Sequence, residues 1–260
     1  MTKILLAGLA FGALVMPAMG ADIAPYNKVP PPPAWGWTGF YIGATVGWAG
    51  AADTIVNTGS YAGAGGFSTL LTVGAIPAAL TMTNTGFIGG GQIGYDWQVW
   101  PSWVLGIEAD FQGVDAKGSN SHTFLGSPAF ASITAAYSRE LDSLGTLRGR
   151  FGYLWFPSLL FYGTGGLAYG DNKIGAAAAC PTCQAAGSTS NTSAGWTLGG
   201  GAEWRFAPAW SVKAEYLYVD FGLHGNTISY TYLGDATTLT STIRERDNIV
   251  RFGVNYMFGY

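Results

Sequence analysis

Eight segments of about 10 to 14 residues dominate this chain, and within each of them apolar and polar side chains alternate. A period of two places successive side chains on opposite faces of a β-strand. The connections alternate as well, because three are very short and contain a proline, whereas four are long. The predicted strands are 37–48, 85–98, 103–114, 139–154, 159–170, 194–206, 210–222 and 247–258.

Composition indicates which surroundings these strands face. Only 10% of the residues are charged and 40 of 260 are glycine, whereas typical soluble domains carry about 25% charged residues. After the first 20 positions no apolar run is long enough for a membrane-spanning helix, which needs about 20 residues. The closed β-barrel is then the one fold that suits lipid, because it pairs every backbone group internally.

The connections orient this barrel. Short turns at one end and long loops at the other are typical of outer-membrane barrels, with the turns in the periplasm. The short turns surround Pro101, Pro157 and Pro208, and aromatic residues cluster beside them, as rings do at a water–lipid boundary. The fold class is therefore all-β, an eight-stranded antiparallel up-and-down transmembrane β-barrel with short periplasmic turns and long extracellular loops. The loops are predicted at 49–84, 115–138, 171–193 and 223–246.

The N-terminal region lies outside the alternating pattern. Residues 1–20 hold Lys3, an apolar run and a small-residue triplet ending at Gly20, which is typical of a cleaved secretory signal peptide. Residues 21–36 form a Pro-rich periplasmic tail, expected to be extended, and 37–260 form the barrel. Without the signal peptide, 11 Lys and Arg stand against 15 Asp and Glu. This mild acidity predicts no nucleic-acid partner.

Alternation places the charges of the strand cores on the inward face. A basic side chain that faces mid-bilayer lipid costs roughly 2–4 kcal/mol, and an eight-stranded barrel has an interior just wide enough for its own side chains. Charges buried there must be paired. We expect a lumen ion-pair network, with a narrow aqueous path as the alternative. Its predicted members are Asp96, Glu108, Asp110, Arg148, Arg150, Glu203, Arg205, Lys213, Glu215 and Arg251.

The two cysteines, Cys180 and Cys183, form a CPTC unit in a predicted loop. A thioredoxin-like pair would open a helix in a βαβ unit, and a structural zinc site would need four ligands. Neither context is visible in the sequence. Because disulfides persist outside the bacterial cytosol, we predict a small disulfide in an exposed loop.

Signals for catalysis or cofactors are weak. Gly89, Gly91 and Gly94 match GxGxxG, but they lie inside an alternating strand instead of opening a helix. His122 and His224 fall in separate predicted loops. A lipid-modifying enzyme at the outer face and haem ligation are minor alternatives. We expect a non-enzymatic protein without a cofactor or metal.

The predicted loops and rim offer two further features. Five bases there can pair with lipopolysaccharide phosphates, although Arg244 and Arg246 can equally pair with the neighbouring Glu245 and Asp247. The apolar stretch 67–80 can fold over the barrel mouth, dip into lipid or contact a partner. The five bases are Lys117, Arg139, Lys173, Arg244 and Arg246.

Six stretches carry a resemblance to a known family. They are WTGFYIGATVGW (37–48), GGGQIGYDWQ (89–98), TLRGRFGYLW (146–155), YGTGGLAYG (162–170), EYLYVDFG (215–222) and VRFGVNYMF (250–258). Over the whole barrel and the Pro-rich leader, the chain resembles the small eight-stranded outer-membrane barrels of the opacity-porin type, found in rhizobial, brucella-like and related alphaproteobacteria.

The resemblance implies a role and partners. Family members are mostly abundant surface proteins that stabilise the envelope, and some are implicated in solute passage, host contact or haem binding. We therefore expect envelope integrity and surface presentation, with a narrow porin, or a receptor or adhesin acting through the long loops, as alternatives. Expected partners are outer-membrane lipid, lipopolysaccharide, the barrel-assembly machinery and an unidentified extracellular ligand. The assembly signal implied for the last strand is Val250, Phe252, Val254, Tyr256 and Phe258.

Overall fold

The computed structural model describes residues 36–63, 66–126, 131–181 and 183–258. The predicted signal peptide, nearly all of the predicted tail, and Gly259 and Tyr260 lie outside these ranges. A helix, α1 (Gly66–Thr72), lies between the first two strands, and no helix in the described ranges is long and apolar enough to cross a membrane. The strands are β1 (Gly39–Tyr61), β2 (Ala79–Trp100), β3 (Trp103–Phe124), β4 (Ile133–Phe156), β5 (Leu159–Cys180), β6 (Cys183–Ala207), β7 (Trp210–Tyr232) and β8 (Asp235–Met257).

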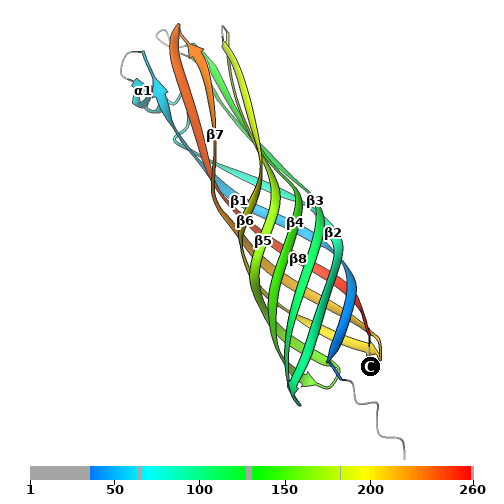
Figure 1. The fold of residues 1–260 in the computed structure, drawn as a ribbon. Coiled ribbons are helices and arrows are strands. Elements are labelled where there is room, and N and C mark those ends of the chain that lie inside the picture. Colours follow the sequence, from blue (N-terminus) through cyan, green and yellow to red (C-terminus); the bar gives the residue numbers. More distant parts are fainter. Residues whose placement is uncertain (1–35, 64–65, 127–130, 182, 259–260) are drawn as a thin grey trace, which may run out of the picture. The chain divides into compact units, whose positions relative to one another are not determined.

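The strands pair antiparallel in chain order, and β8 pairs with β1 to close the barrel (Figure 1). The predicted eight-stranded antiparallel fold is confirmed. At the periplasmic end each predicted proline turn is a two-residue connection between strands. These turns are tied to the next hairpin, as where Leu154 N donates to Ser102 O at 2.8 Å. The short turns therefore form a continuous hydrogen-bonded rim.

Large apolar side chains cover the outside of the barrel next to this rim. In β1, Phe40, Ile42, Val46 and Trp48 are each more than half exposed, which suits contact with lipid. We take each strand from its periplasmic end to the last residue of the continuous outward apolar belt as the membrane-spanning segment, and the outward Val56 of β1 and Leu223 of β7 lie beyond that belt. These last residues are Trp48, Phe87, Phe111, Leu147, Tyr169, Trp196, Tyr216 and Val250.

The strands continue well beyond this apolar belt, so the four predicted long loops are wrong over most of their length. Each strand has 22 to 25 residues. Beyond Trp48 of β1, the outward positions include the polar Thr54 and Thr58 as well as Val56, while the apolar Ile55 and Tyr61 face inward. The alternation persists, but its apolar face changes side because the surroundings change from lipid to water.

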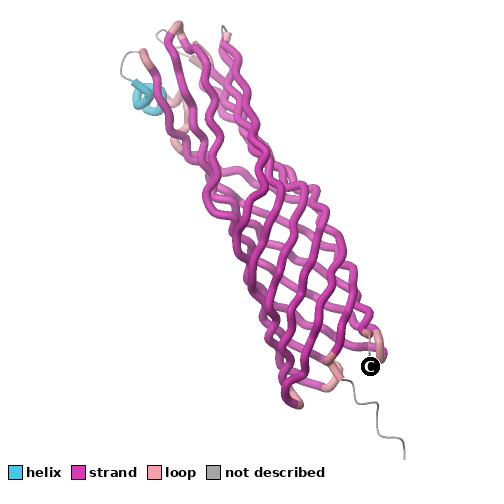
Figure 2. Tube along the Cα trace, in the orientation of Figure 1, coloured by secondary structure: helices cyan, strands magenta, loops and turns pink. Residues whose placement is uncertain are grey.

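Above the belt the barrel opens into two sheets. Pairing between β2 and β3 ends at Thr85 and Lys117, and pairing between β6 and β7 ends at Trp196 and Asp220. The first extracellular sheet contains β7, β8, β1 and β2, and the second contains β3 to β6. Figure 2 shows the strands parting into these two groups at the α1 end.

The two extracellular sheets enclose an apolar core. The first sheet contributes residues such as Ile55 and Tyr232, and the second contributes residues such as Tyr137 and Ile174. The connection containing α1 packs on this core through Leu70, which is wholly buried. The apolar stretch 67–80 therefore packs on the protein's own extracellular core, and its contact with a partner stays a prediction.

The close approach of strands at Gly90 generates a prediction. An added Cβ at Gly90, on the inward face of β2, would lie 2.1 Å from Phe111 O and 2.8 Å from Gln112 Cα. At the outward Gly91 the nearest atom would be Gly43 O at 3.8 Å, an ordinary contact. Gly90→Ala should lower the free energy of unfolding by about 1–3 kcal/mol because the backbone has to shift, and Gly91→Ala should change it little. Urea unfolding in detergent micelles measures both, and equal midpoints would contradict the prediction.

Candidate functional site

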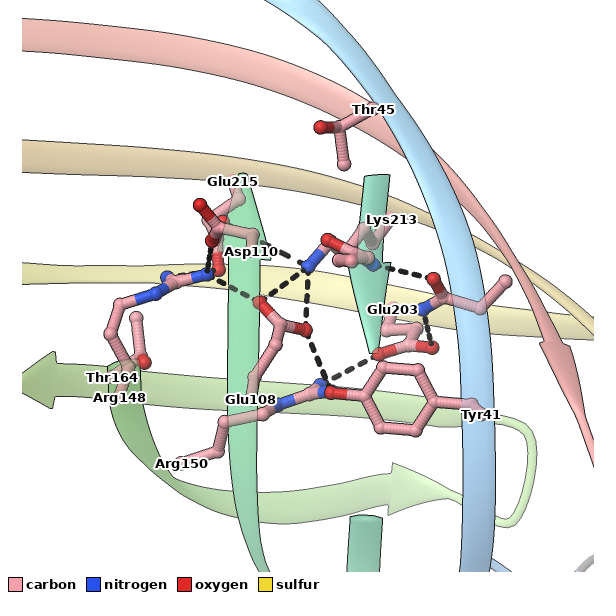
Figure 3. A network of polar contacts seen from close by, with 12 residues as sticks. Tyr41, Thr45, Glu108, Asp110, Arg148, Arg150, Thr164, Glu203, Lys213 and Glu215 are labelled. Carbon is pink, nitrogen blue, oxygen red and sulfur yellow. Dashed lines mark hydrogen bonds and ion pairs between the residues drawn. The ribbon is translucent and has the colours of Figure 1, made fainter. Parts of the chain in front are cut away.

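Nine charged side chains lie buried together inside the membrane-spanning part of the barrel, each no more than 5% exposed. Alternation of the strands turns all of them inward. Figure 3 shows seven of them pointing toward one another, namely Glu108, Asp110, Arg148, Arg150, Glu203, Lys213 and Glu215. Four are positive and five are negative. This central cluster consists of Asp96, Glu108, Asp110, Arg148, Arg150, Glu203, Lys213, Glu215 and Arg251.

Glu108 of β3 is the hub of the central cluster. Both of its carboxylate oxygens accept hydrogen bonds from Lys213 Nζ, at 3.0 and 2.9 Å. One oxygen also accepts from Arg148 Nη2, and the other from Tyr41 Oη at 2.7 Å. All four cations of the cluster lie within 3.7 Å of this carboxylate. Its negative charge therefore compensates several buried positive charges at once.

Two arginines connect the remaining acids on this side of the lumen. Arg251 donates to Glu215 at 2.7 Å and to Asp110 at 2.9 Å. Arg148 donates to the same two carboxylates, at 3.0 and 2.9 Å. Thr146 Oγ1 also donates to Asp110, at 2.8 Å. Strands distant in the sequence are thereby joined through shared partners.

Arg150 extends the central cluster toward the periplasm. Its Nη2 donates to Glu203 at 2.6 Å, and its Nη1 lies 3.4 Å from Asp96. The guanidinium stands 4.1 Å from the ring centroid of Tyr162 and donates to Tyr41 Oη at 2.8 Å. Stacking on an aromatic ring partly replaces the hydration that a buried arginine loses.

Arg205 lies apart from this cluster, at the periplasmic end. Its guanidinium donates to the carbonyl oxygens of Gly36 and Pro208 and stands 5.5 Å from the ring centroid of Trp37. Trp37 is wholly buried and donates to Pro157 O at 3.0 Å. Although Trp37 was predicted to begin the first strand, it instead covers the periplasmic mouth.

Apolar layers lie on both sides of the central cluster. Trp37, Leu154 and Met257 belong to the layer on the periplasmic side, and Leu144, Leu217 and Ile249 belong to the layer on the extracellular side. In the part of the chain that the structure describes, no three His, Cys, Asp or Glu side chains are placed to hold a metal ion. The central cluster is thus a buried network of ion pairs between two apolar layers.

A second group of charges, termed the upper cluster, lies above the membrane-spanning segments. Arg139 of β4 is wholly buried, and its Nη1 lies 3.0 Å from Asp53 of β1. Its Nη2 lies 2.8 Å from Asp247 and 4.0 Å from Glu245, both on β8. Arg139 was predicted as a rim base, and this prediction is wrong because the residue faces the interior. It connects the two extracellular sheets.

The upper cluster has three carboxylates for one arginine. Burial raises the pKa of Asp53 to about 6, against the opposing effect of Arg139. Burial also raises the pKa of Glu245 to about 7, and neighbouring Asp247 adds to the shift. Neither carboxylate oxygen of Glu245 has a hydrogen-bond partner among the described residues. Negative charge is therefore less well compensated here than around Glu108.

Both histidines lie in strands, so their predicted placement in loops is wrong. His122 of β3 has Nε2 3.0 Å from Gly74 O. His224 of β7 has Nε2 3.1 Å from Ser193 Oγ of β6, and its Nδ1 is 3.7 Å from Glu245 Oε2. The second contact set joins β6, β7 and β8 where the β6–β7 ladder has ended.

The other predicted rim bases lie outside the barrel. Arg246 is exposed, and the remaining three are paired with acids, which any lipopolysaccharide phosphate would have to displace. Arg244 pairs with Asp220 and not with Glu245 or Asp247, so that expected alternative is wrong for Arg244. The pairs are Lys117 with Asp115 and Glu140, Lys173 with Asp142, and Arg244 with Asp220.

The cysteines and the last strand complete the predicted sites. Cys180 is disulfide-bonded, and its backbone pairs with Cys183 across the β5–β6 connection. They lie at the tip of a hairpin and not in a long loop. On β8, Val250, Phe252 and Val254 are 51%, 60% and 44% exposed. Tyr256 and Phe258, also predicted in the assembly signal, have ring centroids 5.0 Å apart.

Sequence reasoning missed several members of these clusters. Tyr41 and Tyr162 contact the central cluster, and their inward parity on β1 and β5 was the available signal. Asp53, Glu245 and Asp247 were assigned to loops or strand ends because the apolar face was assumed to stay outward. The alternation continues beyond the apolar belt with its apolar residues facing inward. Extending it there places Asp53, Glu245 and Asp247 on the inward face.

Comparisons with known proteins agree with this architecture. The family described as outer membrane protein beta-barrel domain matches residues 9–258. The 31 kDa outer-membrane immunogenic protein of Brucella melitensis is 34% identical over 270 residues, covering 99% of this chain and 100% of that protein. The 22 kDa outer membrane protein of Rhizobium leguminosarum bv. viciae is 28% identical over 199 residues, covering 75% and 69% respectively. Among solved structures, OprG from Pseudomonas aeruginosa aligns at 12% identity with a TM-score of 0.36, covering 86% of this chain and 99% of that one.

Both named relatives are outer-membrane proteins, and the matched family domain spans nearly the whole chain. This localisation agrees with the apolar belt on the outside of the strands. The chain therefore belongs to the outer membrane protein beta-barrel domain family.

Proposed function

We propose that this protein is a structural barrel that supports the integrity of the outer membrane and presents its two extracellular sheets at the cell surface. The observation that carries the proposal is the central cluster, in which Glu108 is shared by four cations. Paired, buried charges fill the lumen of an eight-stranded barrel and join its strands. The apolar layers on both sides support a closed interior over the alternative of a narrow porin.

The proposed surface role rests on the upper half of the molecule. The strands carry the chain well beyond the apolar belt, and the relative from Brucella melitensis is named an immunogenic outer-membrane protein. Lipopolysaccharide is the proposed partner at the rim, where Arg246 is exposed on β8 and offers a guanidinium group that suits phosphate. Arg244, also exposed, would exchange Asp220 for that phosphate. The outward side chains of β8 are the surface proposed for the assembly machinery.

Planar-bilayer recording tests the closed lumen. The wild-type barrel should give no stable conductance steps, because an ion would have to pass buried side chains at every level. The double substitution Glu108→Ala and Arg148→Ala removes the central contact and should permit larger leakage. Stable steps from the wild-type protein, unchanged in the double variant, would overturn the proposal.

The energetic role of Glu108 can be measured directly. Glu108→Gln leaves Lys213 and Arg148 without their shared charge, which should lower the free energy of unfolding by about 3–5 kcal/mol. Glu140→Gln, on the exposed pair with Lys117, is the matched control and should have little effect. Urea titrations in detergent compare the two. Equal effects would show that the central cluster contributes no more than a surface pair.

The upper cluster predicts a pH dependence. A carboxyl whose pKa is raised in the folded state contributes stability that is fully present below its ordinary pKa and lost as the pH rises through the raised value. For Glu245 this loss extends from the ordinary 4.5 to about 7. Glu245→Gln should therefore stabilise the extracellular sheets at about pH 8, by on the order of 1–3 kcal/mol, and change them little in acid.

Hydrogen exchange of the extracellular strands at about pH 5 and pH 8 measures this effect. Protection factors, in which each exchange rate is divided into the intrinsic rate at the same pH, should be lower at pH 8 than at pH 5 in the wild type, and Glu245→Gln should remove most of that difference. Glu140→Gln serves as control because Glu140 lies on the outer face of β4. An unchanged pH dependence in Glu245→Gln would contradict the role assigned to this carboxyl.

A further inference from the structure

Three side chains from three strands form a line at the seam between β6 and β7. Ser193 Oγ lies 3.1 Å from His224 Nε2, and His224 Nδ1 lies 3.7 Å from Glu245 Oε2. Ser193 and Glu245 are buried, and the side chain of His224 is 24% exposed. A nucleophile beside one ring nitrogen and a carboxylate beside the other is the order of atoms that serine hydrolases use.

We propose that Ser193, His224 and Glu245 form a hydrolytic site for a carboxylic ester carried by a lipid of the outer leaflet. Ser193 is the nucleophile, His224 is the general base, and Glu245 is a positioning residue that orients the imidazole. This activity goes beyond the structural role proposed above. It uses residues outside the central cluster, so the two proposals stand or fall separately.

The backbone explains why these residues meet. A bulge in β7 between Asp220 and Gly222 shifts the strand by one residue, and Gly222 adopts a φ of 85°. Because a one-residue shift exchanges the two faces of a strand, His224 turns toward the interior. Glu245 of β8 pairs with Gly222 and is therefore a diagonal neighbour of His224 on the same face.

The charges suit this division of roles. Burial lowers the pKa of His224, and the positive charge of Arg139 adds to that shift, so the imidazole is neutral and able to accept a proton near pH 7. Glu245 is faced by Arg139 of β4, Asp53 of β1, Asp247 of β8 and His224 of β7. With its pKa raised to about 7, Glu245 is mostly ionised only in alkaline solution. Hydrolysis should therefore increase as the pH rises through about 7.

The location points to the substrate. Ser193 lies three residues above Trp196, whose ring marks the upper edge of the apolar belt and lies 5.4 Å from the ring of Tyr218. Aromatic rings of this kind sit at the lipid head-group level, where the ester bonds of acyl chains also lie. Among the described residues, the backbone ladder between β6 and β7 ends at Trp196 and Asp220. The seam is held by side chains, as where Asn226 Nδ2 donates to Gly187 O at 2.9 Å, so access from the side requires no broken ladder.

The proposed reaction has two balanced steps. Ser193 Oγ bonds to the acyl carbon while its proton moves to His224 Nε2, and the ester C–O bond breaks as the alcohol leaves with that proton. Water then adds to the acyl-serine and gives a proton to His224. The carboxylic acid leaves as Ser193 regains this proton. Asn172, a buried neighbour on β5, has an Nδ2 without a partner among the described residues and is the donor available for the oxyanion.

Covalent labelling tests the nucleophile. The folded full-length barrel in micelles is treated with a fluorophosphonate at about pH 8, and the labelled peptide is identified by mass spectrometry. We expect label on Ser193 in the wild type, no label at this position in Ser193→Ala, and label on Ser193 reduced about a hundredfold or more in His224→Ala. Ser241→Ala is the matched control, because Ser241 is equally buried but bonds Asn57 Oδ1. Absence of label on Ser193 in the folded wild type would overturn the proposal, and the heat-dependent gel shift verifies folding of each variant.

Ester hydrolysis tests the substrate and the role of Glu245. Turnover of p-nitrophenyl palmitate should exceed that of the acetate, whereas faster acetate turnover would overturn the lipid assignment. Glu245→Gln should lower turnover and remove its rise through pH 7 even though it stabilises the fold. Unchanged turnover in this more stable variant would overturn the positioning role. If Ser193→Ala does not fold, Ser193→Cys replaces it, with His224-dependent alkylation by iodoacetamide as the readout.

Discussion

Inside a bilayer every backbone N–H and C=O group of a strand must find its partner within the protein, because lipid offers none. The eight strands meet this requirement by closing, with β8 paired to β1. Above the apolar belt, water can satisfy the free edges. There the ladders between β2 and β3 and between β6 and β7 end, and the barrel becomes two sheets. The closed barrel therefore ends, and the two sheets begin, at the level where the strands leave the lipid.

Closure by only eight strands leaves a narrow interior, and this decides how charge is arranged. Charges excluded from the lipid face must lie inward, where each needs a partner. Glu108 satisfies this need for Lys213 and Arg148 together. In the upper cluster the negative charges are less fully compensated, because Arg139 is the shared partner of three carboxylates. Stability is therefore distributed unevenly, with the firmer network inside the membrane.

The sequence predicts most of the membrane-spanning barrel because lipid imposes an apolar outer face. Phe40 and Ile42 face out and Tyr41 faces in by simple alternation. Beyond Trp48 the outer face of β1 carries polar residues such as Thr54 and Thr58, so outward apolar residues mark only the membrane-spanning part of the strand. The meeting of Ser193 with His224 could not be predicted at all. It depends on the β7 bulge and on two strands that no longer share a register.

The rim where the barrel opens is also where the chain tolerates an unfavourable group. A buried carboxylate that has no hydrogen-bond partner among the described residues, as at Glu245, destabilises a fold. Local costs of this kind occur most often at functional sites. Here the destabilising group, Glu245, lies beside His224, which contacts Ser193. The proposed role of Glu245 in orienting His224 explains why an acid is buried at this position, whereas packing alone does not.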